Sequence, residues 1–208
     1  MNQAVIFDLD GTLYDNKCLH WMLPLCELFS LRLGYLGRER STRKVIRTQN
    51  FASSEDFYAC FFGNISKHHP ERAGLWYHRH YLPLQARILR HFCKADPWVK
   101  PRIQQLRSQG IKVVLYSDYG YAEQKLQALG LDPALFDAIV DAPSLGGLKP
   151  NEQVTRRLLA QIGVKPEDAL FVGDREDCDA ESARRVGSRH QLVIRRGKEV
   201  SFSNVSAS

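Results

Sequence analysis

Two aspartates, Asp8 and Asp10, follow a run of apolar residues near the start of the chain, in the segment AVIFDLDGTLYDN (residues 4–16). Clustered carboxylates repel one another unless a cation neutralises them, and oxygen ligands of this kind suit Mg²⁺. A carboxylate held against such a cation can act as a nucleophile, and a second one can move a proton. The segment therefore indicates a metal-assisted catalytic pair at the end of a buried strand.

Other residues able to do chemistry follow later apolar segments. They are Ser117 with Asp118 after IKVVLYS, Lys149 in GGLKP, and Asp174, Asp177 and Asp179 in and after DALFVGD. In an open α/β sheet, ligands bind at the carboxyl ends of the strands. We therefore expect these side chains to meet at one edge of a sheet, where they could bind a divalent metal and a phosphate together.

Each group near Asp8 has a distinct predicted role. Asp8 can attack phosphorus and form an aspartyl-phosphate. Asp10 is expected on the same side of the extended chain, because the period of a strand is two, and it can give a proton to the leaving group and later take one from water. Gly11 lets the backbone turn sharply, and Thr12 can form a hydrogen bond nearby.

The remaining groups fit the phosphate and the metal. The hydroxyl of Ser117 and the amides after it, beginning with that of Asp118, can hold phosphate oxygens. Lys149 can screen the charge of the phosphate and of the nucleophile, and Asp174 can complete the metal shell.

The elements that must position these residues alternate regularly after residue 95. Strands are predicted at 111–117, 136–142, 168–174 and 190–195, and helices at 121–130, 151–163 and 178–187. This alternation predicts right-handed crossovers and an open parallel sheet. The polar residues 196–208 are predicted to form an unpaired tail.

Residues 15–95 break this alternation. They show helical periodicity without a convincing strand, Ser53 or Ser54 is a plausible N-cap, and Pro24 and Pro83 are expected to kink or split their helices. An insert of this length far exceeds the usual loop of an α/β unit. We predict a helical cap domain at 15–95, inserted into a catalytic core made of residues 1–14 and 96–208.

Four segments in this order, FDLDGTL, VVLYSD, GGLKP and FVGDREDCD, resemble the motifs of the haloacid dehalogenase superfamily, mainly its phosphatases. The resemblance implies an α/β fold with a doubly wound, Rossmann-like parallel sheet and an inserted α-helical cap. It also implies Mg²⁺ and an aspartyl-phosphate on Asp8, with Asp10 as acid/base that ligates the metal through its carbonyl. The resemblance and the chemistry together give Thr12, Ser117, Asp118 and Lys149 as phosphate-binding residues, and Asp8, Asp10, Asp174 and Asp179 as metal ligands.

The sequence departs from the family pattern at Asp118, where the second motif more often continues Thr-Asn-Gly. A carboxylate beside a phosphate is unfavourable, so we expect Asp118 to turn away or to touch the metal through water. True dehalogenases of the superfamily lack the second aspartate of the first motif, so Asp10 argues against that activity. Asp177 competes with Asp179 for the second acidic position of the last motif.

Composition restricts the other possibilities. The 208-residue chain is 44% hydrophobic and 25% charged, and no apolar run approaches the length of a membrane span. No secretory signal precedes the first strand, and the five cysteines are scattered, so we expect a cytoplasmic protein with free thiols. Residues 15–95 hold 13 Lys and Arg against 6 Asp and Glu, which fits a solvated face, nucleic-acid binding or an anionic substrate.

Taken together, the sequence predicts a Mg²⁺-dependent phosphatase for a small phosphorylated metabolite, without nucleic-acid or membrane partners, acting as a monomer or homodimer. One alternative of the same chemistry is a phosphotransferase or sugar-phosphate mutase. Another is a catalytically idle binding or scaffold protein. The sequence does not identify the substrate, because no motif is recognisable in the predicted cap.

Overall fold

The fold centres on a six-stranded sheet in the order β3-β2-β1-β4-β5-β6, seen in a computed structural model that describes residues 3–197 and 199–206. The strands are β1 (Ala4–Phe7), β2 (Lys112–Ser117), β3 (Ala138–Asp141), β4 (Ala169–Gly173), β5 (Arg189–Arg196) and β6 (Glu199–Phe202). The first five strands are parallel, and β6 is antiparallel to β5. The predicted parallel sheet is therefore confirmed.

Helices cover both faces of the sheet. They are α6 (Val99–Ser108), α7 (Ala122–Ala128), α8 (Glu152–Ile162) and α9 (Glu181–Val186), with short η2 (Pro133–Leu135), η3 (Ala142–Leu145), η4 (Pro166–Asp168) and η5 (Glu176–Ala180). Val5 and Phe7 of β1 belong to the apolar cluster that includes α6 and α7. Ala4 and Ile6 belong to the cluster on the other face, with α8 and α9. Alternate residues of β1 are thus buried on opposite faces of the sheet, which explains why its sequence is apolar throughout. With helices on both faces, the sheet is doubly wound.

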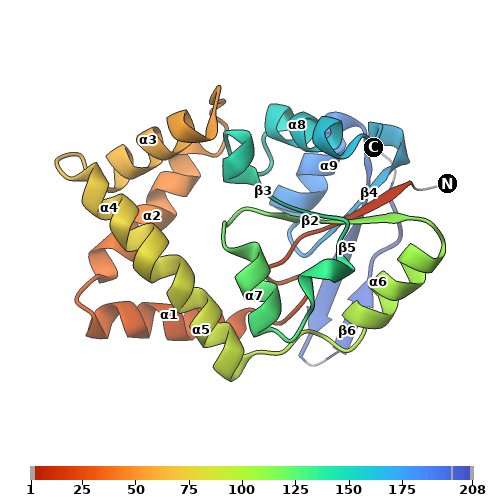
Figure 1. The fold of residues 1–208 in the computed structure, drawn as a ribbon, viewed down its shortest axis with the longest axis horizontal. Helices are drawn as coiled ribbons and strands as arrows, with labels where there is room; N and C mark the ends of the chain where they lie inside the picture. The colour runs from red at the N-terminus through yellow and green to blue at the C-terminus, as the bar shows by residue number, and fades with distance from the viewer. Residues whose placement is uncertain (1–2, 198, 207–208) are drawn as a thin grey trace.

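Within residues 15–95 the chain forms five α-helices and one π-helical segment, and Figure 1 shows them gathered beside the sheet. They are α1 (Lys17–Phe29), α2 (Leu33–Ile46), α3 (Ser54–Ile65), α4 (Pro70–Trp76), π-helical η1 (Tyr77–Tyr81) and α5 (Leu82–Phe92). Ser53 caps α3, as predicted, because its Oγ accepts a hydrogen bond from the amide of Asp56. Helix α1 is not split at Pro24, and Pro83 is the second residue of α5, which begins where the π segment has already altered the helical hydrogen-bond pattern.

The helical insert does not have an apolar core separate from that of the sheet. Its buried residues, among them Phe61 and Tyr77, belong to the same cluster as Phe7 and Leu126. Helix α5 packs against α7, which joins the insert to the sheet side of the molecule. These helices fall inside the range 15–95, and the division into cap and core domains remains a prediction.

The prediction of an unpaired C-terminal tail is wrong for most of its described part. Glu199–Phe202 pairs with β5, and Ser206 pairs with His190. Phe202 also packs edge-on against Trp98, with ring centroids 5.0 Å apart. The polar composition of residues 199–202 does not indicate a strand. They form one because their backbone pairs with β5. The predicted tail also includes residues 198 and 207–208, which lie outside the described residues. Within 3–197 and 199–206, no helix is both long and apolar enough to cross a membrane.

Asn151, at the start of α8, stabilises the chain that follows Lys149. Buried Asn151 caps α8 by accepting from the amides of Gln153 and Val154, and its Nδ2 donates to the carbonyl of Gln49 in the insert at 2.9 Å. We expect Asn151→Ala to lower the free energy of unfolding by about 2 kcal/mol, since both the cap and the buried hydrogen bond are lost. Urea denaturation measures this, with Asn50→Ala, at an exposed position, as the control. Equal stability of the two variants would contradict the role of Asn151.

Candidate active site

Asp8 lies directly after β1, at the carboxyl end of the central strand. Its Oδ1 accepts a hydrogen bond from Nζ of Lys149 at 2.6 Å, and its Oδ2 accepts one from Oγ1 of Thr12 at 3.0 Å. Thr12 also lies 3.4 Å from Oδ1 of Asp174, which follows β4. The loops after β1 and β4 therefore meet at Asp8, as the strand order predicts for an open α/β sheet.

Three carboxylates gather at this point. One oxygen each of Asp8, Asp174 and Asp179 lies within 4.8 Å of the others. Burial and the neighbouring carboxylates raise the pKa of Asp8 well above its ordinary value, with Lys149 acting against them. Burial, followed by the charge of Asp179, raises the pKa of Asp174 to about 6. Three oxygen ligands that repel one another fit a hard divalent cation such as Mg²⁺.

Two glycines make room for the carboxylates. Gly11 has φ +99°, and a Cβ there would lie 2.3 Å from Oδ2 of Asp174. A Cβ at Gly173 would lie 2.3 Å from the carboxylate of Asp179. Only glycine allows the chain to pass so close to both carboxylates.

Lys149 supplies a positive charge directly to this cluster. Its ammonium lies 2.6 Å from Asp8 and 2.7 Å from Asp179 and donates to the carbonyl of Tyr116, and the side chain is 3% exposed. Burial opposes the charge, but Asp179 and Asp8 raise the pKa of Lys149 well above its ordinary value. Lys149 is therefore protonated and neutralises part of the negative charge around Asp8.

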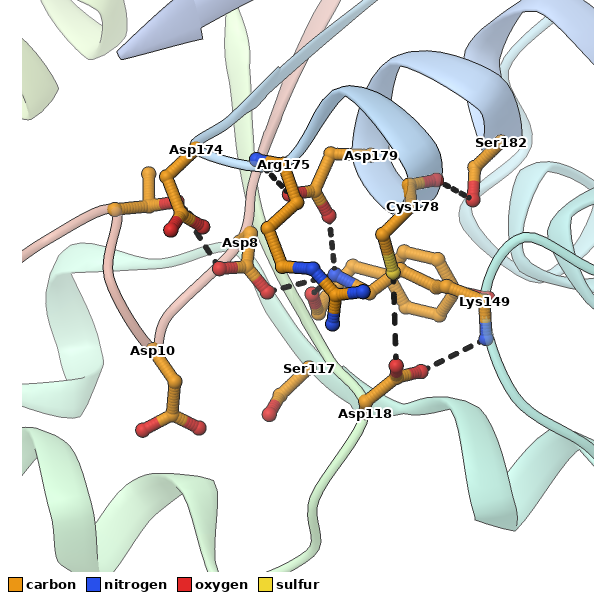
Figure 2. A network of polar contacts seen from close by, with 12 residues as sticks. Asp8, Asp10, Ser117, Asp118, Lys149, Asp174, Arg175, Cys178, Asp179 and Ser182 are labelled. Atoms are coloured by element: carbon orange, nitrogen blue, oxygen red, sulfur yellow. Dashed lines mark hydrogen bonds and ion pairs between the residues drawn. The ribbon is translucent and has the colours of Figure 1, made fainter. Parts of the chain in front are cut away.

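Ser117 and Asp118 hold the loop after β2. Ser117 is buried, and its Oγ accepts a hydrogen bond from the amide of Tyr119. Asp118 accepts from the backbone amide of Lys149 at 2.8 Å and contacts Sγ of Cys178, as the dashed lines of Figure 2 show. The Asp118 side chain is thus engaged with neighbouring loops, and it also lines the small pocket that contains Asp8. Phosphate binding by Asp118 stays a prediction.

Asp10 does not extend in the direction that strand geometry predicts. Figure 2 shows its carboxylate pointing away from Asp8, because β1 ends at Phe7 and the alternation of a strand no longer applies. Nζ of Lys125 lies 2.8 Å from Asp10, and the hydroxyl of Tyr14 donates to it as well. Asp10 nonetheless shares with Asp8 a small pocket of about 50 Å³.

Sequence reasoning missed Lys125 and Tyr14, the residues that hold Asp10. Lys125 is fully buried on α7, on the same helical face as Ala122, Leu126 and Ala128. A lysine on the apolar stripe of a helix was the available signal, since a buried lysine needs a negatively charged partner.

Asp177 and Asp179, the two candidates for the second acidic position of the last motif, lie in different surroundings. Asp179 is buried in the carboxylate cluster, and its Oδ2 accepts from the amide of Arg175. Asp177 is exposed and pairs with Arg47 and Arg175, and these partners lower the pKa of its carboxyl against the effect of burial. Geometry therefore favours Asp179 for contact with a metal.

Two arginines of the insert reach the site, Arg43 in the last turn of α2 and Arg47 directly after this helix. Arg43 donates to the carbonyl of Asp118 at 3.0 Å and to the hydroxyl of Tyr77, pairs with buried Glu39, and lies over the ring of Tyr119 at 3.9 Å. Nε of Arg47 donates to the carbonyl of Lys149 at 3.0 Å. Of the explanations considered for the positive charge of residues 15–95, a solvated face does not hold for Arg43 and Arg47, which tie the insert to the core.

Several known proteins are similar to this chain over most of its length. The family model described as haloacid dehalogenase-like hydrolase matches residues 3–187. A glyceraldehyde 3-phosphate phosphatase from Methanopyrus kandleri is 30% identical over 216 residues, covering 95% of this chain and 86% of the relative. A protein of the same name from Methanocaldococcus jannaschii is 23% identical, covering 90% and 82%.

Among solved structures, an HAD phosphatase from Thermococcus onnurineus is similar to this chain, with a TM-score of 0.65. The two share 24% sequence identity, and the match covers 95% of this chain and 88% of the other. At this identity the likeness establishes the fold.

The pair of Asp10 and Lys125 can be tested through stability. We expect Lys125→Met to lower the free energy of unfolding by about 3 kcal/mol, because it leaves the largely buried carboxylate of Asp10 without its cation. In a double-mutant cycle with Asp10→Asn, followed by urea denaturation, the two effects should couple by about 1–3 kcal/mol. Lys100→Met, at an exposed position, is the control. Additive effects would show that the pair does not stabilise the fold.

Proposed function

Because this chain belongs to the haloacid dehalogenase-like hydrolase family, as its motifs predicted, we propose that it hydrolyses a small phosphomonoester with the help of Mg²⁺. The observation that supports this most strongly is Asp8, held by Lys149 beside the carboxylates of Asp174 and Asp179. Similarity to two proteins named glyceraldehyde 3-phosphate phosphatase supports a small phosphorylated sugar or related metabolite as substrate.

In the proposed reaction, a carboxylate oxygen of Asp8 forms a bond to phosphorus while the bond from phosphorus to the leaving oxygen breaks. Asp10 gives its proton to that oxygen. Water then attacks the phosphorus of the aspartyl-phosphate, Asp10 takes the proton of this water, and the bond between Asp8 and phosphorus breaks. Asp10 must turn from Lys125 toward the substrate for these transfers, since its carboxylate points away from Asp8 in this structure.

The other residues bind and orient the substrate. Lys149 neutralises the phosphate and Asp8, and Ser117, Thr12 and the amides after Ser117 are proposed to hold phosphate oxygens. Asp8, Asp174 and Asp179, with the carbonyl of Asp10, are proposed to hold Mg²⁺. Bound there, Mg²⁺ supplies positive charge that stabilises the transferring phosphoryl group.

We also propose that residues 15–95 act as a cap domain on a core of residues 1–14 and 96–208. Arg43 and Arg47 bring helix α2 against the loops that carry Asp118 and Lys149, so the insert can exclude bulk water from Asp8.

Purified protein should release inorganic phosphate from phosphorylated three-carbon to six-carbon metabolites when Mg²⁺ is present, and lose this activity with EDTA. Formation of an isomerised sugar phosphate without phosphate release would instead identify a mutase. No turnover of any member of the panel would contradict an enzymatic role.

Asp8→Asn should lower kcat by at least about 10³-fold, because an amide oxygen is a poor nucleophile toward phosphorus. Phosphate release measures this, and circular dichroism checks that the fold is kept. Normal hydrolysis by a folded Asp8→Asn protein would show that the nucleophile is another residue.

Asp179→Asn and Asp177→Asn form a matched pair, because both remove one carboxylate from the same motif. We expect Asp179→Asn to weaken Mg²⁺ binding by at least about tenfold and Asp177→Asn to leave it within about twofold. The dependence of Tm on Mg²⁺ concentration reports this binding without turnover. The reverse order would assign the metal contact to Asp177.

A further inference from the structure

A second, larger pocket adjoins the small one above Asp8. It measures about 460 Å³ and shares Asp118, Tyr119 and Lys149 with the smaller pocket. Its far wall is formed by helix α2 of the insert. A substrate whose phosphate lies at Asp8 would therefore extend its remaining atoms into this space, whose volume suits a small molecule.

The walls of this pocket carry a large excess of positive charge. Its Lys and Arg side chains are Arg40, Arg43, Lys44, Arg47, Lys149 and Arg175, and among the described residues Asp118 and Asp177 are the carboxylates that line it. Both carboxylates already have partners: Asp118 accepts from the amide of Lys149, and Asp177 pairs with Arg47 and Arg175. A concave surface with one sign of charge concentrates ligands of the opposite sign.

Most of these cations are engaged with the protein, but two are available to a ligand. Arg43 pairs with Glu39 and binds the carbonyl of Asp118, and Lys149 lies between Asp8 and Asp179. Within residues 3–197 and 199–206, by contrast, the side chains of Arg40 and Lys44 form no hydrogen bond or ion pair.

Arg40 and Lys44 are also arranged to act together. They lie four residues apart on α2, so their side chains project from the same face of the helix. Arg40 additionally lines a third pocket of about 150 Å³ that contains Asp10, which places it beside the reacting end of the site.

We propose that Arg40 and Lys44 bind a second anionic group of the substrate, a carboxylate or a second phosphate, and so select phosphomonoesters that carry negative charge at both ends. This inference rests on the proposed phosphatase function. In this proposal the insert, through Arg40 and Lys44, selects substrates by their second charge, whereas Asp8 and its neighbours contact only the reacting phosphate.

The test uses two pairs of substrates that differ in the second charge. 3-Phosphoglycerate is compared with glycerol 3-phosphate, in which a neutral alcohol replaces the carboxylate, and fructose 1,6-bisphosphate is compared with fructose 6-phosphate. At constant ionic strength, we expect kcat/KM to be at least tenfold higher for the charged member of one pair or both. The pair that shows the preference identifies the group as carboxylate or phosphate.

Variants connect this preference to the two residues. Arg40→Met and Lys44→Met should each reduce the ratio of charged to neutral kcat/KM severalfold, mainly through KM, and the double variant should bring it close to one. Arg38→Met removes the same charge from the same helix outside this pocket and should keep the wild-type ratio. Equal kcat/KM within both pairs for the wild-type protein, or an unchanged ratio in the double variant, would overturn the inference.

Binding separates failure of this inference from failure of the proposed function. If none of the four compounds is hydrolysed with Mg²⁺, the phosphatase proposal fails, and calorimetric titration of 3-phosphoglycerate and fructose 1,6-bisphosphate into the Asp8→Asn protein still tests the pocket. At least one compound should bind, with a Kd at least tenfold higher when Arg40→Met and Lys44→Met are added. Absence of binding, or an unchanged Kd, would overturn the inference.

Discussion

The site depends on one buried ammonium group shared between carboxylates. Lys149 lies within 2.7 Å of both Asp8 and Asp179, and its side chain is almost completely enclosed. A buried charge without a partner is strongly destabilising, so Lys149 stabilises the close approach of Asp8, which follows β1, and Asp179, which follows β4. The ammonium supplies one positive charge against three carboxylates, counting Asp174, and this imbalance favours a bound cation.

The insert contributes to this arrangement through backbone groups of the core. Arg43 and Arg47 bind the carbonyls of Asp118 and Lys149, while the Asp118 side chain binds the amide of Lys149. The loops after β2 and β3 are therefore fixed to each other and to α2 at the same time. These contacts place Arg40 and Lys44 of α2 in the wall of the pocket that Lys149 also lines, where the proposed binding of a second anionic group would take place.

The sequence predicted the residues whose positions follow from local rules. Asp8 and Lys149 were predicted to belong to one site because ligands bind at the carboxyl ends of parallel strands. The four motifs also follow one another in the order typical of the family. Asp10 was predicted to lie on the same side of the chain as Asp8, and it does not, because its direction depends on where β1 ends and on Lys125, which lies 115 residues away. The pairing of Glu199–Phe202 with β5 was missed because it depends on a neighbouring strand, and the polar composition of this segment does not indicate it.

The continuous apolar cluster across the insert and the sheet affects how the molecule unfolds. Phe61 and Tyr77 of the insert share one buried cluster with Phe7 of β1, and α5 packs on α7. Separating the insert from the sheet would expose apolar surface on both, at a cost that rises with the area uncovered. The two parts are thus expected to melt in a single cooperative transition, and a large-to-small change deep in the insert would loosen the catalytic sheet as well.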